Sequence, residues 1–239
     1  MKTVGIIGRA QRNQDDQEII QINEYVRRAL THFDDVATIA LLPTNDLFYC
    51  NLKSKHDRLS PTDRAKLDHI LKQCDGIIAP GGSSWFQFDE YIINHAIAND
   101  KPFLGICAGF QCLCGMYSDT EPRLFEIPDE THKNGGLRYS HTNFIVDHTK
   151  LKEIIGQDTI LVNSAHRYGV NPPLRENIII SAYSEDDIIE AVEVPDKKFA
   201  IGVQWHPEYI YDENSQKIFR AFVNNLTSSQ SPRVLLATA

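Results

Sequence analysis

Short apolar runs and longer amphipathic segments alternate through the first half of the chain. The apolar runs predict strands at residues 3–7, 36–41, 76–79 and 103–106. The segments between them carry apolar residues at helical spacing, and they begin near Asp15 or Asp16, at Ser60 and near Phe86. Strands that alternate with helices are typical of a parallel sheet covered on both faces. The pattern therefore predicts an α/β fold.

Two of these helices start at capping residues. Ser60 is followed directly by Pro61 and then by Asp63, which is the usual order at a helix N-terminus. Asp15 or Asp16 is expected to cap the first helix in the same way. The buried face of that first helix would consist of Ile19, Ile22, Val26, Ala29 and Phe33.

The second half of the chain changes character. Residues 119–139 are polar and contain several Pro and Gly residues, which predicts a loop, with a hairpin as the alternative. Asp212 is expected to cap a last helix. No composition shift marks a linker, so we expect one domain over residues 1–226 and a Ser/Thr-rich tail at residues 227–239. Closely spaced strand-like runs before the last helix predict an antiparallel portion at the sheet edge, at residues 142–146, 160–162, 178–182, 188–194 and 199–205.

Composition narrows the classes of function. The 239 residues carry a net charge of -8, which argues against a nucleic-acid surface because such a surface needs a basic face. The N-terminus lacks the pattern of a secretory signal, and no apolar segment approaches membrane-spanning length. Five cysteines without framework spacing favour reduced thiols in the cytoplasm. They are Cys50, Cys74, Cys107, Cys112 and Cys114.

Cys107 stands between Gly105 and Gly109, where an apolar run meets an amphipathic segment. This spacing predicts a sharp strand–turn–helix elbow that presents a nucleophile. Glycines on both sides allow the turn and let the helix pack closely on the strand. The helix N-terminus favours the thiolate form of the cysteine. A free cysteine in an ordinary strand-to-helix turn is the alternative.

A second reactive pattern follows the last predicted strand. His206 comes at the end of an apolar run, Pro207 stops the strand, and Glu208 follows. A cysteine nucleophile needs a base that accepts its proton and an acid that orients the imidazole. A buried histidine with a solvated glutamate is the alternative for this motif alone. Together with the elbow, it predicts a triad of Cys107, His206 and Glu208.

The elbow and the late His-Pro-Glu motif together resemble those of class I glutamine amidotransferase domains. Residues 80–82 are similar to the oxyanion loop of that family. Residues 162–166, Val-Asn-Ser-Ala-His, resemble the substrate-side strand of its gamma-glutamyl hydrolase (peptidase C26) branch, which includes gamma-glutamyl-gamma-aminobutyrate hydrolases. The resemblance implies a flavodoxin-like three-layer sandwich with a mostly parallel central sheet and a smaller antiparallel portion.

The resemblance also implies a role for each matched residue. Cys107 would attack the gamma-carbonyl of a glutamine-like substrate and form a gamma-glutamyl thioester. His206 would move the proton, and Glu208 would orient His206. The resemblance further assigns the oxyanion hole to the backbone amides of Gly81 or Gly82 and Ala108, and the glutamyl pocket to Gln111, Ser164 and His166.

Three functions are compatible with these motifs. The first is a stand-alone hydrolase of a small gamma-glutamyl amide, which the Val-Asn-Ser-Ala-His form favours. The second is a glutaminase component that delivers ammonia to a separate synthetase partner. The third is a catalytically silent binding module, against which the complete triad argues. No cofactor and no metal is expected, and a homodimer is compatible with either enzyme.

Overall fold

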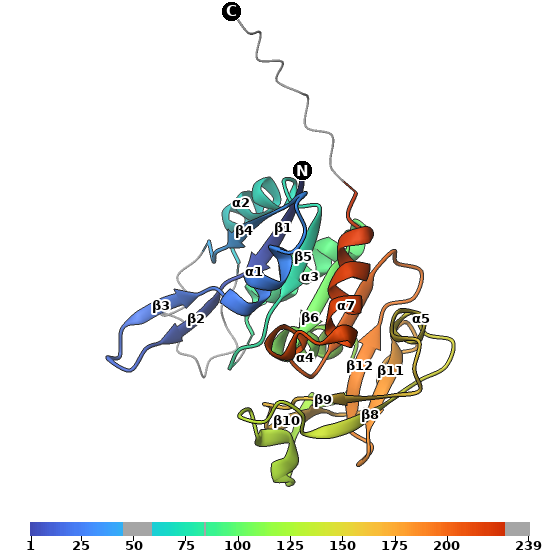
Figure 1. Ribbon diagram of the computed structural model, residues 1–239. Helices are drawn as coiled ribbons and strands as arrows, with labels where there is room; N and C mark the ends of the chain where they lie inside the picture. Colours follow the sequence, from blue (N-terminus) through green and yellow to red (C-terminus); the bar gives the residue numbers. More distant parts are fainter. Residues whose placement is uncertain (45–58, 84, 228–239) are drawn as a thin grey trace, which may run out of the picture.

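The protein is described here by a computed structural model that covers residues 1–44, 59–83 and 85–227. Within these residues, nine strands form one sheet in the order β4-β1-β5-β6-β13-β12-β11-β8-β9 (Figure 1). The strands are β1 (Lys2–Ile7), β4 (Val36–Leu41), β5 (Gly76–Ala79), β6 (Phe103–Ile106), β8 (His141–Ile145), β9 (Thr159–Val162), β11 (Ile179–Ser184), β12 (Ile189–Glu193) and β13 (Ala200–Val203).

The sheet has a parallel part and an antiparallel part. Strands β4, β1, β5, β6 and β13 pair in parallel, with β6 in register with β13 from Phe103 to Ile106. Strands β12, β11, β8 and β9 continue the sheet with antiparallel pairings. This arrangement confirms the predicted parallel sheet with an antiparallel portion at one edge.

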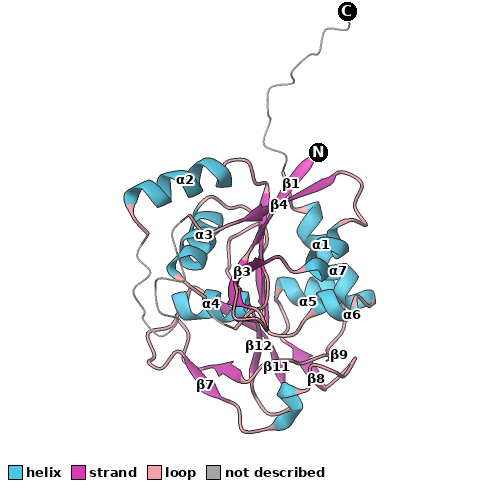
Figure 2. Cartoon of the chain, turned by 90° about the vertical axis from the view of Figure 1, so that its left-hand side faces the viewer, coloured by secondary structure: helices cyan, strands magenta, loops and turns pink. Residues whose placement is uncertain are grey.

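Helices cover both faces of the sheet (Figure 2). Neighbouring residues of a strand point to opposite faces, so Ile6 packs in one core and Ile7 in the other. One face carries α1 (Glu24–Leu30), α5 (Lys150–Ile155), α6 (Pro207–Ile210) and α7 (Glu213–Asn224), and the other carries α2 (Pro61–Leu71), α3 (Gln87–Ala98) and α4 (Ala108–Met116). In the described segments, none of the helices combines the length and apolar character needed to span a membrane.

The prediction of a first helix that begins at Asp15 or Asp16 is wrong over the first half of that helix. A two-stranded hairpin occupies that place, formed by β2 (Arg9–Arg12) and β3 (Glu18–Gln21). Its turn is held by Asn13, whose side-chain oxygen accepts hydrogen bonds from the backbone amides of residues 15 and 17. Asp16 in the turn has a φ of 59°, which a helix does not allow. The two aspartates therefore form a turn and cap no helix.

Helix α1 starts at a different residue from the one expected. The side chain of Asn23 accepts hydrogen bonds from the amides of Tyr25 and Val26, which makes Asn23 the N-cap. Val26 and Ala29 are buried, as the helical pattern predicts. The capping box at Ser60 forms as expected and starts α2.

The polar stretch at residues 119–139 contains more structure than a loop. Its strand β7 (Leu124–Glu126) pairs antiparallel with the distant β10 (Tyr168–Val170), so no local hairpin forms. A short helical turn, η1 (Glu130–Lys133), follows. Cys50 and residues 228–239 of the expected tail lie outside the described residues.

Substituting Gly109 by Ala should destabilise the fold. A Cβ atom at Gly109 would lie 2.1 Å from the backbone oxygen of Ala79. Relief of this clash would require the backbone of β5 or α4 to shift. We expect a loss of about 1–3 kcal/mol in the free energy of unfolding, measured by urea denaturation. In an exposed helix, Gly→Ala would raise the free energy of unfolding by up to about 1 kcal/mol. The sign of the measured change therefore distinguishes a packing effect from a helix-propensity effect.

Gly136→Ala is the matched control for Gly109→Ala. The nearest atom to a Cβ atom at Gly136 is the side-chain oxygen of Asn134, at 3.9 Å, so its stability should stay within about 0.5 kcal/mol of the parent. Equal stability of the two variants would show that the close approach at Gly109 is not required.

Candidate active site

Cys107 occupies the elbow between β6 and α4. Its φ of 50° and ψ of -105° lie outside the regions that residues with a side chain prefer. Its amide donates to the carbonyl of Val203 at 2.9 Å, which extends the β6–β13 ladder to the turn. A Cβ atom at Gly105 would lie 2.9 Å from the backbone of Gly109, so both flanking glycines are needed for the turn. The packing around the elbow holds Cys107 in its strained conformation.

His206 and Glu208 follow β13, which lies beside β6 in the sheet. The Nδ1 atom of His206 lies 2.9 Å from Oε1 of Glu208, and both side chains are buried. Pro207 starts the short helix α6 and thereby turns the chain back. Cys107 lies on the other side of the same site, since a Cβ atom at Gly81 would contact both Cys107 and the imidazole, and Cys107 contributes to the raised pKa of His206.

The charges around His206 determine its protonation. Burial alone would lower the pKa of His206. The electrostatic interactions with Glu208 and then with Cys107 outweigh burial and raise the pKa of His206 well above its ordinary value. Glu208 and Cys107 thus favour the protonated form of the imidazole.

Three residues outside the predicted triad hold the His206–Glu208 pair in place. The Asn163 amide donates to the carbonyl of His206 at 2.9 Å and accepts from its amide at 2.8 Å. Nδ2 of Asn23 donates to Oε1 of Glu208 at 3.2 Å. The ring of Tyr209 stacks on the imidazole with centroids 4.7 Å apart. Asn23 and Tyr209 were not found from the sequence, because neither belongs to a recognisable motif.

The loop at residues 80–82 lies against Cys107 and His206. A Cβ atom at Gly81 would lie 2.6 Å from Cε1 of His206 and 3.4 Å from Cβ of Cys107. The guanidinium of Arg9 holds the loop by donating to the Pro80 carbonyl from Nε at 3.1 Å and from Nη2 at 2.5 Å.

A buried ion pair fixes the guanidinium of Arg9. Its Nη1 atom bonds to the carboxylate of Asp89, and both side chains are almost fully buried. The Asp89 carboxylate also accepts from the Phe86 amide at the start of α3. Arg9 and Asp89 were missed from the sequence, since they are 80 residues apart and match no motif. A Cβ atom at Gly82 would lie 3.0 Å from Cδ of Arg9, so the glycine admits the side chain.

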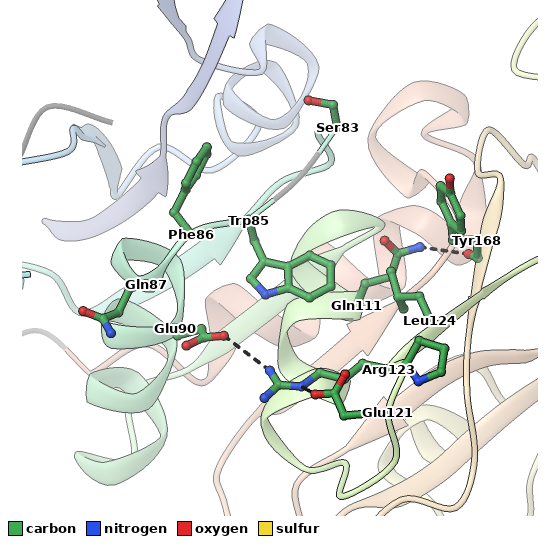
Figure 3. Close-up of a pocket in the computed structure, with 11 residues that line it drawn as sticks. Ser83, Trp85, Phe86, Gln87, Glu90, Gln111, Glu121, Arg123, Leu124 and Tyr168 are labelled. Carbon is green, nitrogen blue, oxygen red and sulfur yellow. Dashed lines mark hydrogen bonds and ion pairs between the residues drawn. The ribbon is translucent and has the colours of Figure 1, made fainter. Parts of the chain in front are cut away.

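Gln111 lines a cavity of about 630 Å³ beside the elbow helix (Figure 3). Its Nε2 donates to the carbonyl of Tyr168 at 2.9 Å and to Oε1 of Gln204 at 3.0 Å. Side chains of opposite charge form ion pairs on the cavity wall, where the guanidinium of Arg123 lies 3.2 Å from the carboxylate of Glu121 and 3.6 Å from that of Glu90. The cavity thus offers an apolar surface with paired cationic and anionic groups.

Ser164 and His166 do not line this cavity, although Nδ1 of His166 lies 3.2 Å from the Tyr168 carbonyl that Gln111 also contacts. The Ser164 hydroxyl donates to the backbone carbonyl of His132 at 2.8 Å. Nε2 of His166 lies 3.3 Å from Oε1 of Glu190. The structure thus brings the predicted nucleophile, base and acid together with the loop at residues 80–82, and it places these two predicted substrate residues in a buried cluster next to the cavity wall.

The fold and this arrangement define a class I glutamine amidotransferase-like α/β protein. The Peptidase C26 family model matches residues 87–208, which are 122 of the 239 residues. The chain therefore belongs to the Peptidase C26 family, a family of glutamine amidotransferase-like cysteine hydrolases.

Curated relatives support the same class. A glutamine amidotransferase-like protein of Rickettsia prowazekii is 28% identical over 232 residues, which cover 69% of this chain and 82% of that protein. The CTP synthase of Lactobacillus johnsonii is 27% identical over 246 residues, which cover 90% of this chain and 45% of that enzyme. The chain thus spans less than half the length of this CTP synthase.

Solved structures share the fold. The glutaminase domain of Trypanosoma brucei CTPS, with bound acivicin, superimposes with a TM-score of 0.66 at 19% identity and covers 98% of this chain and 99% of that chain. A glutamine amido transferase of Methylobacillus flagellatus gives a TM-score of 0.63 at 12% identity, with 97% of each chain covered. At these identities the likeness establishes the α/β architecture.

Cys107 should be the thiol that reacts fastest among the described cysteines. Burial raises the pKa of Cys74 to about 11 and holds the pKa values of Cys112 and Cys114 well above their ordinary range. Their sulfurs therefore stay protonated at neutral pH and unreactive. Iodoacetamide treatment of a Cys50→Ser background, followed by peptide mass mapping, should give alkylation at Cys107. Alkylation of Cys112 or Cys114 at an equal rate would show that the elbow does not activate its cysteine.

Glu208→Gln should shift the pH dependence of catalysis. Removing the carboxylate charge lowers the pKa of His206, so the protonated imidazole is lost at a lower pH as the pH rises. The alkaline limb of kcat/KM for glutamine should therefore move to lower pH, and the maximal rate should fall about 10²-fold or more. Glu213→Gln, at an exposed position of α7, is the control and should leave the profile unchanged. An unshifted alkaline limb in Glu208→Gln would show that this carboxylate does not set the protonation of His206.

Proposed function

We propose that this protein is a cysteine hydrolase that cleaves the gamma-glutamyl amide bond of a small glutamine-like substrate. The observation that carries the proposal is the buried group of Cys107, His206 and Glu208 around Gly81, in which His206 hydrogen-bonds to Glu208 at 2.9 Å. A thiolate paired with an imidazolium is the reactive state of a cysteine hydrolase. All three groups come from one chain and are already in contact.

The proposed reaction has two stages. The Cys107 sulfur attacks the gamma-carbonyl carbon, and a proton from His206 moves to the nitrogen as the carbon–nitrogen bond breaks. The amine leaves, and a gamma-glutamyl thioester remains on Cys107. In the second stage a water molecule attacks the thioester, His206 accepts its proton, and glutamate leaves as the sulfur regains its charge. Glu208 keeps Nδ1 of His206 protonated and the ring oriented throughout.

The negative oxygen of each tetrahedral intermediate needs hydrogen-bond donors. We assign this role to the backbone amides of Gly81 or Gly82 and of Ala108, the first residue of α4. The absence of a Cβ atom at Gly81 supports the assignment, because a side chain there would collide with His206. Each such donor contributes about 2.7–4 kcal/mol to transition-state stabilisation.

The cavity beside the elbow helix supports binding of a glutamyl group. Gln111 on its wall lies one helical turn from the nucleophile, since its amide donates to the Cys107 carbonyl at 2.9 Å. A glutamyl group carries an alpha-carboxylate and an alpha-ammonium group. Arg123 offers the matching positive charge and Glu90 the matching negative charge (Figure 3). We propose that, on binding, the alpha-carboxylate of the substrate pairs with Arg123 and its alpha-ammonium group pairs with Glu90, in place of the ion pair between these two side chains.

A second candidate function is a glutaminase that delivers ammonia to a separate synthetase. The observation that favours it is the similarity to CTP synthases, which covers 90% of this chain but 45% of the Lactobacillus johnsonii enzyme. Under this function the remaining part of the reaction would belong to a partner protein. The complete constellation within one chain favours hydrolysis without a partner, which is the first candidate.

Turnover by the purified protein separates the two candidates. We expect hydrolysis of a gamma-glutamyl amine or peptide to be faster than hydrolysis of glutamine, measured by release of glutamate. Intact mass after a rapid acid quench should show a glutamyl adduct on the parent protein and on Cys74→Ala, and none on Cys107→Ala. Cleavage of glutamine alone, and only after addition of a second protein, would support the glutaminase. Turnover that survives in Cys107→Ala would overturn both candidates.

A further inference from the structure

Three imidazoles and one carboxylate meet in a buried cluster within the antiparallel part of the protein. His132 comes from η1, His141 from the start of β8, His166 from the segment after β9, and Glu190 from β12. One ligand atom from each residue can be chosen so that all four lie within 4.8 Å of one another. Their side chains are exposed by no more than 6%. None of the four belongs to the proposed triad.

The cluster holds a buried carboxylate without a paired cation. Oε1 of Glu190 lies 3.3 Å from Nε2 of His166, 3.6 Å from Nδ1 of His132 and 4.0 Å from Nε2 of His141. This oxygen has no hydrogen-bond partner, and neither ring nitrogen of His141 has one. In the described segments, no Lys or Arg forms an ion pair with Glu190. Burial of unpaired polar and charged groups is strongly unfavourable, so a positive charge at the centre would stabilise the cluster.

The outer contacts of two histidines determine which ring nitrogens face inward. Nε2 of His132 lies 3.1 Å from a carboxylate oxygen of Asp186, and Nδ1 of His166 lies 3.2 Å from the carbonyl of Tyr168. Both partners are acceptors, so each of these nitrogens carries the hydrogen of a neutral ring. The inward nitrogens, 3.3 Å apart, are then both lone pairs. Two lone pairs at this distance repel each other unless a cation lies between them.

We propose that His132, His141, His166 and Glu190 bind one divalent transition-metal ion, with zinc the best match to these donors. Zinc is held tetrahedrally by imidazole nitrogen and carboxylate oxygen at about 2.0–2.2 Å, which places neighbouring ligand atoms about 3.3 Å apart. The contacts at 3.3 and 3.6 Å match this spacing, and the fourth ligand atom, Nε2 of His141, lies at a longer 4.0 Å from Oε1 of Glu190. Magnesium and calcium prefer oxygen donors and do not match a site with three imidazoles.

The surroundings of the four residues have the features of a metal site. A carboxylate that accepts from the outer nitrogen of a ligating histidine is a common arrangement at zinc, and Asp186 has this place next to His132. The second oxygen of Glu190, Oε2, accepts from Asn143 at 3.4 Å, which leaves Oε1 free to point inward. Four protein ligands leave no open position, so the ion is structural.

The site would stabilise the segment that supports the proposed catalytic histidine. The amide of His166 and the hydroxyl of Ser164 both bond to the carbonyl of His132, each at 2.8 Å. Asn163, which directly precedes Ser164, forms the two hydrogen bonds to the backbone of His206. A metal at this cluster therefore ties η1 to the support of His206. The inference gives His166 a structural role in place of the substrate contact that the family resemblance implies, and it departs from the expectation of no metal.

Metal analysis of the purified full chain tests this inference. Protein from zinc-supplemented cultures, purified without an affinity metal, should contain about one equivalent of zinc per chain by mass spectrometry. Removal of the metal by a chelator should lower the Tm, and zinc should restore it. Asp186→Asn, which changes no ligand, should weaken zinc binding about 10–100-fold.

Substitutions locate the metal. His132→Ala and the near-isosteric Glu190→Gln should lose the zinc, while His69→Ala, at an exposed position of α2, and Cys107→Ala should keep it. If both ligand variants fail to fold, cobalt titration of the chelator-treated parent still tests the site, because tetrahedral cobalt gives intense visible absorption. A parent protein that binds neither zinc nor cobalt overturns the inference. Metal that is lost in Cys107→Ala but kept in Glu190→Gln also overturns it.

Discussion

The close approach of α4 to β5 and β6 is the constraint on which the rest of the structure depends. Gly105 and Gly109 allow the helix backbone to contact the strands where no side chain fits. Cys107 is thereby forced to a positive φ, which residues with a side chain rarely adopt. Phe110 and Leu113, both fully buried, anchor the helix on the sheet. The strain at the cysteine is thus supported by the core packing of the helix that follows it.

Polar contacts between distant segments complete the site around the elbow. Arg9 and Asp89 are 80 residues apart, Asn163 and His206 are 43 apart, and Asn23 and Glu208 are 185 apart. Each pair joins a group near the nucleophile to an element that lies elsewhere in the sequence. Buried polar networks in which most groups are satisfied make a site rigid. The geometry at Cys107 consequently depends on the folding of the whole chain, including the β2–β3 region.

Local patterns were sufficient to predict the sheet and the elbow. The strands of the parallel part are short apolar runs, and the glycine spacing around Cys107 is confined to five residues, so both can be recognised without tertiary information. The first helix was wrong because this segment fits two patterns: Ile19 and Ile22 have helical spacing, whereas Ile20 and Ile22 alternate as in an extended strand. The deciding interactions are the turn at Asn13 and the packing of Ile20 near Gly8, where a Cβ atom would lie 2.7 Å from Ile20.

Other features depend on contacts that no local pattern contains. Strand β7 exists because it pairs with β10, more than 40 residues later in the chain. The cluster around Glu190 combines residues from three elements and one loop, and its histidines are at least nine residues apart in the sequence. The residues that hold His206 and the loop at residues 80–82 are ordinary Asn, Arg and Asp side chains. Their roles follow from where the chain places them.

Asn23 illustrates how one side chain can restrict sequence drift. Its oxygen starts α1 by accepting two backbone hydrogen bonds, and its nitrogen donates to Glu208. Helix N-caps usually interchange among Asn, Asp, Ser and Thr. Here Asp would cap the helix equally well but would bring a second negative charge against Glu208, and Ser or Thr has only one atom for both tasks. A position that is permissive in most helices is therefore restricted to a carboxamide in this protein, and the restriction comes from the far end of the chain.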